Sequence, residues 1–203
     1  MELKEGVLAK QYTKNLIKRE FINLLTEESF SSITIAMIAE RCEINRNTFY
    51  YHYEDIYALV KEILDDEIRK VDEEFNSSFS WEKSTLHAVS FLLDNKKACQ
   101  NLFRSISKKE IDSYLYKVCE SVMSKYIDNE CELKSINPIE SDKILVRNFY
   151  RSALVGLLDK WIQDGMEEDA QKLIFRIGKL FDGNIERSLR ISEELKNENP
   201  FSH

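Results

Sequence analysis

Residues 33–53 read ITIAMIAERCEINRNTFYYHY, and this stretch decides how the N-terminal part of the chain folds. Thr34 is a favourable N-cap, because its hydroxyl can accept a hydrogen bond from a free backbone N–H in the first turn of a helix. Apolar residues then recur at Ile35, Ile38 and Ala39, which is the spacing of one helix face. The stretch therefore predicts a short helix that begins after Thr34 and packs one face on a core.

A second short helix is predicted directly after a tight turn at 43–45. Asn45 can cap its first turn, and Phe49 and Tyr53 form its inward-facing pair. The other side chains are rich in hydrogen-bond donors and aromatic rings: Arg46, Asn47, Thr48, Tyr50, Tyr51 and His52. Two short helices in this order are typical of a helix-turn-helix, whose second helix enters the major groove of DNA.

The residue types of the second helix suit DNA. Arginine binds guanine edges bidentately, asparagine does the same for adenine, and threonine offers a hydroxyl or a methyl group. Tyrosine, histidine and the helix N-terminus suit phosphates. His52 lacks a carboxylate–histidine arrangement, which favours DNA contact over catalysis. We predict DNA contacts from the following residues: Thr34, Asn45, Arg46, Asn47, Thr48, Tyr50, Tyr51 and His52.

The helix predicted upstream, from about residue 10 to residue 27, carries a cluster of basic residues beside its apolar stripe. A solvated charged face is the usual meaning of such a cluster. Next to a helix-turn-helix, however, the cluster can clamp phosphates. Among its members we select Lys14 as a predicted phosphate contact, ahead of Lys10 and Lys18.

The stretch from Thr34 to Tyr53, continued by EDIYALV at 54–60, closely resembles the DNA-binding signature of the TetR family of bacterial transcriptional regulators. TFYYHY at 48–53 is the most specific part of this resemblance. Two positions depart from it. Glu43 stands where the family usually has glycine, at a cost on the order of 1 kcal/mol in the left-handed region. Ile56 stands where the family often has a lysine, which removes one phosphate contact that the resemblance would supply.

Helical periodicity continues to the C-terminal region, and the low counts of glycine (5) and proline (2) favour long helices over sheets. The patterns predict helices at about 55–76, 81–95, 98–106, 109–128, 140–164 and 167–195, with a loop at 129–139. Together with the N-terminal helices this makes an all-α chain of about nine helices. The resemblance implies a helix-turn-helix DNA-binding domain at 1–54 and a helical domain for effector binding and dimerisation at 55–203.

The resemblance also implies a homodimer in which the last two helices pack as a four-helix bundle with their symmetry mates. The interface residues predicted on this basis are Phe149, Ala153, Leu154, Leu157, Trp161, Leu173, Ile177, Leu180 and Phe181. A place in the core of one chain is the alternative interpretation of the aromatic members. Candidate effector-pocket residues are the aromatic or polar groups Trp81, His87, Phe103, Arg104, Tyr114 and Phe149.

Composition excludes several classes of protein. A net charge of −7 argues against a generally basic, non-specific nucleic-acid binder. Neither the 4 cysteines nor the 3 histidines show a metal-ligand spacing, so we predict no metal, no cofactor and reduced thiols. No apolar leader or membrane-length run occurs in the sequence, which predicts a cytoplasmic protein that does not bind membranes.

The leading hypothesis is a homodimeric repressor that binds a palindromic double-stranded operator and is released or modulated by an unknown small molecule. The alternative is a regulator whose C-terminal domain binds a protein partner in the manner of a co-activator. An enzyme is the remaining class, since His87 with Cys99 or Cys119 is a conceivable Cys–His pair. Nothing in their spacing requires that pair, and we predict that the protein is not an enzyme.

Overall fold

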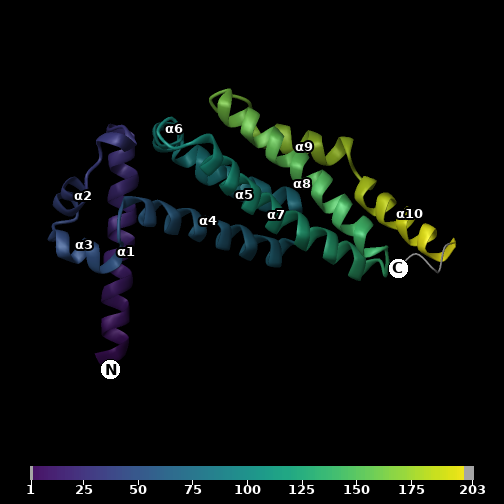
Figure 1. Ribbon diagram of the computed structural model, residues 1–203, viewed down its shortest axis with the longest axis horizontal. Helices are drawn as coiled ribbons and strands as arrows, with labels where there is room; N and C mark the ends of the chain where they lie inside the picture. Colours follow the sequence, from purple (N-terminus) through teal and green to yellow (C-terminus); the bar gives the residue numbers. More distant parts are fainter. Residues whose placement is uncertain (1, 199–203) are drawn as a thin grey trace. The chain divides into compact units, whose positions relative to one another are not determined.

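The computed structural model describes residues 2–198, with side chains from residue 8 onward, and no strand occurs among them (Figure 1). The all-α class is therefore confirmed. The elements are α1 (Glu2–Glu27), the 3-10 helix η1 (Phe30–Ser32), α2 (Ile35–Arg41), α3 (Arg46–His52), α4 (Ile56–Ser78), α5 (Trp81–Asp94), α6 (Lys96–Phe103), α7 (Lys108–Leu133), α8 (Glu140–Gln163), α9 (Ala170–Leu180) and α10 (Asn184–Glu198).

The chain divides into two compact units. The first, which we call the head, comprises 1–66 and 94–108, and the second, the body, comprises 67–93 and 109–203. This division differs from the predicted boundary after residue 54, because α6 packs on α1 and the first part of α4 also belongs to the head. Residues 199–203 of the predicted C-terminal domain lie outside the described residues.

The head is built around the apolar stripe of α1. Ile17 and Phe21 of this stripe are fully buried, as are Ile38 of α2 and Phe49 of α3. α2 packs on α1 and α3 packs on α2, so the two short helices acquire a core that neither could form alone. The side-chain amide of Asn101 donates to the Leu25 carbonyl at 2.8 Å and ties α6 to the end of α1.

Both predicted N-caps of the helix-turn-helix are confirmed. The Thr34 hydroxyl accepts from the backbone N–H of Met37 at 3.3 Å, and the Asn45 carboxamide oxygen accepts from that of Thr48 at 2.8 Å. Glu43 has a φ of 52°, the left-handed conformation that a turn of this length needs. Each short helix therefore starts at a side chain that satisfies one of its own free N–H groups.

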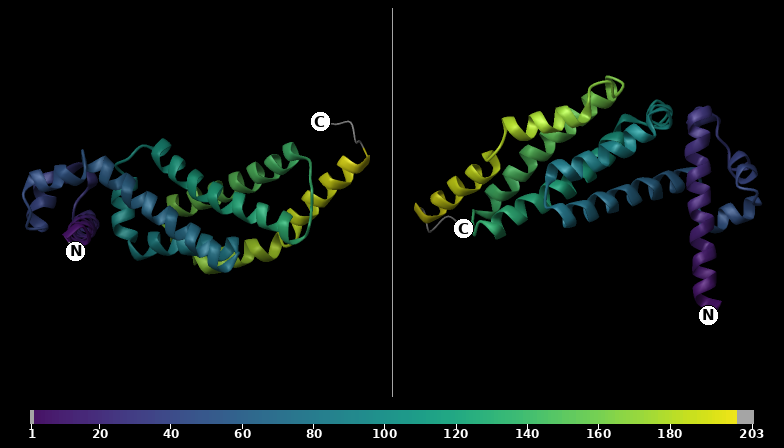
Figure 2. Two further views of the ribbon diagram at one scale, coloured as in Figure 1. Left: turned by 90° about the horizontal axis from the view of Figure 1, so that it is seen from below. Right: turned by 180° about the vertical axis from the view of Figure 1, so that it is seen from behind.

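The body is a bundle whose centre lies on α7. Leu115, Met123 and Ile127 of this helix are fully buried, and α10 adds Leu189 to the same core. α8 and α10 pack side by side (Figure 2). Among the described helices, none combines the length and the apolar character that crossing a membrane requires.

The prediction of one continuous helix at 167–195 was wrong. The structure has two helices, α9 and α10, separated by residues 181–183. Gly183 has a φ of 70°, and the backbone N–H of Asn184 donates to the Phe181 carbonyl, so the chain turns before the second helix starts. Glycine adopts this conformation readily, so the chain turns at Gly183 although the apolar residues on both sides keep a helical spacing.

Candidate functional site

α3 presents the predicted DNA-reading side chains on the outside of the head. Arg46, Asn47 and Tyr50 are exposed, and the Tyr51 ring is exposed to 70%. Phe49 on the opposite side of the helix is fully buried and fixes the rotation of α3 about its axis. This arrangement offers an outward face of one guanidinium, one carboxamide and two phenols, the chemistry that reads base edges and binds phosphates.

Thr34, Asn45 and Thr48 also belong to the predicted set, and each is engaged within the protein. The Thr34 and Asn45 oxygens cap α2 and α3, and the Thr48 hydroxyl lies 3.2 Å from the Asn45 carboxamide oxygen. Their first task is to position the helices. Contact with DNA through their remaining donors stays a prediction.

His52 lies at the end of α3 with its ring packed edge-on against Tyr51, centroids 5.1 Å apart. Its Nδ1 is buried without a hydrogen-bond partner. Burial, followed by the nearby charges of Lys14 and Lys10, holds the pKa of this imidazole below its usual value. His52 is therefore neutral at pH 7, and it can donate a hydrogen bond but adds no positive charge to the face.

Lys14, the predicted phosphate contact, is held by a carboxylate of the head. Its ammonium lies 2.7 Å from Glu62 of α4 and 5.3 Å from the centre of the Tyr53 ring. Lys18, one turn along α1, pairs with Glu62 at 2.7 Å and also with Asp66. We call these four residues, Lys14, Lys18, Glu62 and Asp66, the α1–α4 ion cluster. Two of the three lysines considered on α1, Lys14 and Lys18, are thus paired with carboxylates of α4.

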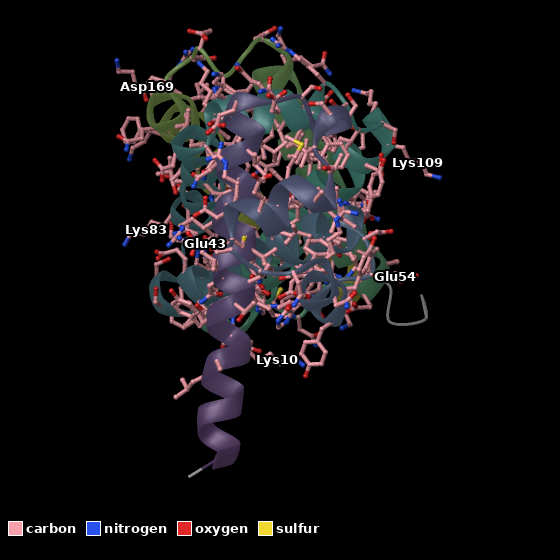
Figure 3. The ribbon with its side chains drawn as sticks, turned by 90° about the vertical axis from the view of Figure 1, so that its left-hand side faces the viewer. Lys10, Glu43, Glu54, Lys83, Lys109 and Asp169 are labelled. Carbon is pink, nitrogen blue, oxygen red and sulfur yellow. The ribbon has the colours of Figure 1, made fainter. Side chains whose placement is uncertain are left out.

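Lys10 was ranked behind Lys14 as a predicted phosphate contact, and its surroundings differ from those of Lys14. Its side chain is exposed (Figure 3). Its ammonium lies 5.1 Å from the centre of the Tyr51 ring. Lys10 therefore adds a positive charge next to the outward face of α3. The available signal was the i, i+4 spacing of Lys10 and Lys14, which places both on one side of α1.

The residues that an enzyme would need are not activated. Cys99 and Cys119 are buried, and burial raises the pKa of the Cys119 thiol to about 12. A thiol in that state is a poor nucleophile at neutral pH. Within residues 2–198, no three histidine, cysteine or acidic side chains are grouped so that they could hold a metal ion.

The body contains a cavity of about 690 Å³ between α5, α7, α8 and the α9–α10 segment. Of the predicted effector-pocket residues, Trp81 and Phe149 line it. His87 lines a separate pocket of about 360 Å³, and Tyr114 is buried in the core. Phe103 and Arg104 belong to the head. The structure therefore brings two of these six residues to one cavity and leaves the others apart, because they lie on faces and in units that periodicity alone does not distinguish.

The predicted dimer residues fall into three groups. Leu154 and Trp161 are buried in their own chain, and the Trp161 indole N–H donates to the Glu168 carbonyl at 2.8 Å. The second group lines the cavity: Phe149, Ala153, Leu157, Ile177 and Phe181. Leu173 and Leu180 of α9 form the third group, outside the cavity lining. The first group is better explained as core.

Two family models match the chain. One, described as "Transcriptional regulator C-terminal region", matches residues 79–183, and the other, described as "Bacterial regulatory proteins, tetR family", matches residues 22–63. Both describe transcriptional regulators and not enzymes. The second match covers the helix-turn-helix and the outward face of α3 described above.

A curated relative is the HTH-type dhaKLM operon transcriptional activator DhaS of Lactococcus lactis subsp. lactis (strain IL1403). It is 18% identical over 145 residues, which are 71% of this chain and 76% of the relative. A solved structure named dihydroxyacetone kinase operon activator DhaS superposes with a TM-score of 0.73 at 19% identity, over 86% of this chain and 97% of that one. At this identity the likeness concerns the fold.

Proposed function

We propose, from the premise that this chain belongs to the TetR family of bacterial transcriptional regulators, that it is a homodimer that binds a palindromic DNA operator through α3. An effector held in the body would modulate that binding. The observation that carries the proposal is the outward face of α3, where Arg46, Asn47 and Tyr51 are exposed over a buried Phe49. A regulator of this kind acts where the genome is, so we place it in the cytoplasm.

The contacts we propose divide by chemistry. Arg46 and Asn47 suit base edges, and Tyr50 and Tyr51 suit phosphates or thymine methyl groups. Lys10 joins them as a phosphate contact, because it is exposed beside Tyr51. Lys14 can contact a phosphate only by exchanging its ion pair with Glu62, so its contribution is smaller than that of Lys10.

Dimerisation through α8 is supported by the outward face of that helix. Leu145 and Phe149 are exposed to 66% and 68%, and Ser152 and Gly156 continue the same line at i+7 and i+11. A Cβ added at Gly156 would meet nothing within 4 Å. Two large apolar residues followed by two small ones allow a second copy of the helix to approach closely. Leu180 of α9, also exposed, extends this surface.

Regulation would follow from the spacing of the two α3 helices of the dimer. They must match successive major grooves, about 34–36 Å apart or a multiple of that. An effector that binds better to a body with another spacing lowers DNA affinity by that difference in binding free energy. Since α4 contributes to both the head and the body, we propose it as the connecting element.

Repression is the output that we propose first. Activation is the second candidate, because both DhaS proteins named above carry the word activator in their names. A reporter gene placed behind the operator distinguishes the two, since deletion of the regulator raises expression in one case and lowers it in the other.

The proposed DNA contact is tested by fluorescence anisotropy with DNA from the upstream region of the gene, against unrelated DNA, across a salt series. Arg46→Ala should weaken specific binding by about 10- to 100-fold, the value of a bidentate base contact. Arg176→Ala, which removes the same charge from the exposed surface of α9, is the matched control and should leave affinity unchanged. Equal affinities of the two variants would remove Arg46 from the interface.

Dimerisation is tested separately by sedimentation of the wild-type protein. A mass of two chains at micromolar concentration is expected, and Gly156→Trp should shift it towards one chain by filling the close approach. A monomeric wild-type protein would overturn this part of the proposal.

A further inference from the structure

The lining of the body cavity combines aromatic rings with carboxylates. Five aromatic side chains border it: Trp81, Tyr126, Phe149, Tyr150 and Phe181. Four acidic side chains do so as well: Glu82, Glu130, Asp182 and Glu186. Lys134 is the single basic residue of the lining. The cavity is therefore negatively charged in an otherwise apolar wall.

Lys134 pairs with two of the four carboxylates of the lining. Its ammonium lies 2.7 Å from Glu130 and 2.6 Å from Glu186, and Glu186 also pairs with Arg190 at 2.8 Å. Glu82 accepts a hydrogen bond from the Ser80 hydroxyl at 2.9 Å. Within the described part of the chain, neither Glu82 nor Asp182 has an ion-pair partner. Glu82 and Asp182 therefore lack the counter-charge that Glu130 and Glu186 receive from Lys134.

The Glu82 carboxylate occupies a position that glycine makes possible. A Cβ added at Gly178 of α9 would lie 3.0 Å from Glu82 Oε1, closer than a methyl group normally approaches. The glycine thus lets the carboxylate rest against the α9 backbone at the cavity wall. Burial, together with the charges of Glu130, Glu82 and Asp182, raises the pKa of the Tyr126 phenol to about 12, so these carboxylates act on one ring of the lining.

We propose that this cavity binds an organic cation, with its charged group between Glu82 and Asp182 and its apolar part against the aromatic rings. Aromatic faces attract cations within about 6 Å, and uncompensated carboxylates add a direct electrostatic attraction. A neutral ligand of the same size would leave both carboxylates without a counter-charge, and an anionic ligand would be repelled by them. The carboxylates and the aromatic rings together therefore favour an organic cation over a neutral or anionic ligand.

A second copy of the chain is a less suitable occupant. In a two-fold interface each surface meets the same surface of the partner, so an acidic cavity wall would face an equally acidic one. The line of Leu145, Phe149, Ser152 and Gly156 on α8 carries no acid and serves that contact better. Phe149, Ser152 and Gly156 belong both to this line and to the cavity lining, which would make ligand binding sensitive to dimerisation.

An organic cation in this cavity would be the effector of the regulator. Only its effect on operator binding rests on the proposed function. Binding is therefore measured first and without DNA. Isothermal titration calorimetry of the full chain compares tetraphenylphosphonium with tetraphenylborate, which has the same shape and the opposite charge. We expect one phosphonium ion per chain, no detectable borate binding, and weaker binding at higher salt. Equal binding of the two ions, or of neither, would overturn the proposal.

Two variants assign the site. The double variant Glu82→Gln and Asp182→Asn should weaken phosphonium binding by about tenfold or more, with an unchanged helical circular dichroism spectrum. Glu132→Gln removes an exposed carboxylate of α7 that does not line the cavity and should leave the affinity unchanged. An unaltered affinity in the double variant would place the cation elsewhere and refute the assignment.

The effect on DNA is a separate readout. If phosphonium binds at the site and changes operator affinity, the cavity is the effector site. If it binds at the site and operator affinity does not change, the cation site stands and its role as effector is refuted. If the protein does not bind the operator at all, the calorimetric result still decides the cation site.

Discussion

A group of charged side chains in the head and another in the body differ in whether their charges are paired within the protein. In the head, the Lys18 side chain is 12% exposed and lies between Glu62 and Asp66, so its charge is compensated inside the protein. In the body cavity, Glu82 and Asp182 border a space of about 690 Å³ and have no ion-pair partner among the described residues. Compensated charges fix the geometry of a surface that must fit a rigid duplex. Uncompensated charges in a cavity define what the cavity can bind.

The same contrast holds for aromatic side chains. Phe49 of α3 is fully buried, and Phe149 of α8 is 68% exposed although it lies in an equally regular helix. The Phe49 ring is packed in the core of the head, unlike the exposed Tyr50 and Tyr51 rings of the same helix. In the body, the ring remains available for a ligand or a second chain.

The largest expected effect tests this difference with one substitution made in each region. Phe49→Ala should lower the free energy of unfolding by about 3–5 kcal/mol, because it empties a filled core position. Phe149→Ala should change it by no more than about 0.5 kcal/mol, as is usual for a surface site. Urea denaturation of both variants measures the two values at a concentration where the protein is monomeric. Similar losses would mean that Phe149 is core and that the contrast is wrong.

A smaller effect is expected at the α1–α4 ion cluster. Lys18→Met should cost about 2 kcal/mol, because it leaves two carboxylates without their common partner. Lys61→Met, which breaks the exposed pair of Lys61 with Asp65 at 2.7 Å, should cost less than about 0.5 kcal/mol. Equal losses in the two variants would contradict a structural role for the cluster.

The cluster also predicts a pH dependence. Burial would raise the pKa of Glu62, but hydrogen bonds from Lys14 and Lys18 outweigh it, and the pKa lies below its usual value. A carboxyl group with a depressed pKa stabilises the folded state above its unfolded pKa, and this contribution is lost as the pH falls through the folded pKa. Urea denaturation from pH 7 to pH 3 should show a shallower acid loss in Lys18→Met than in the wild type.

The smallest expected effect concerns two turns with positive φ. Glu43→Gly in the head should stabilise the fold by about 0.5–1 kcal/mol, because glycine adopts a φ of 52° without strain. Gly183→Ala in the body, at a φ of 70° and in open space, should destabilise it by about 1 kcal/mol for the converse reason. Thermal unfolding measures both shifts, and shifts of the same sign would contradict the backbone argument.

Sequence alone was sufficient where the determinants are local. The caps at Thr34 and Asn45 and the burial of Phe49 and Tyr53 were predicted and confirmed, because a cap reaches two or three residues and a helix face repeats every three or four. The all-α class followed from the same periodicity. The family resemblance of 48–53 also rests on a contiguous stretch.

Tertiary structure decided what depends on distant parts of the chain. Lys14 meets Glu62, a residue 48 positions away, so its free positive charge could not be known from its own helix. The cavity draws its lining from segments between residues 81 and 186, and no periodicity states which faces will meet. Helical pattern identifies an apolar or charged face, whereas its partner is selected by packing of the whole bundle, because burial and ion pairing depend on distance in space rather than along the sequence.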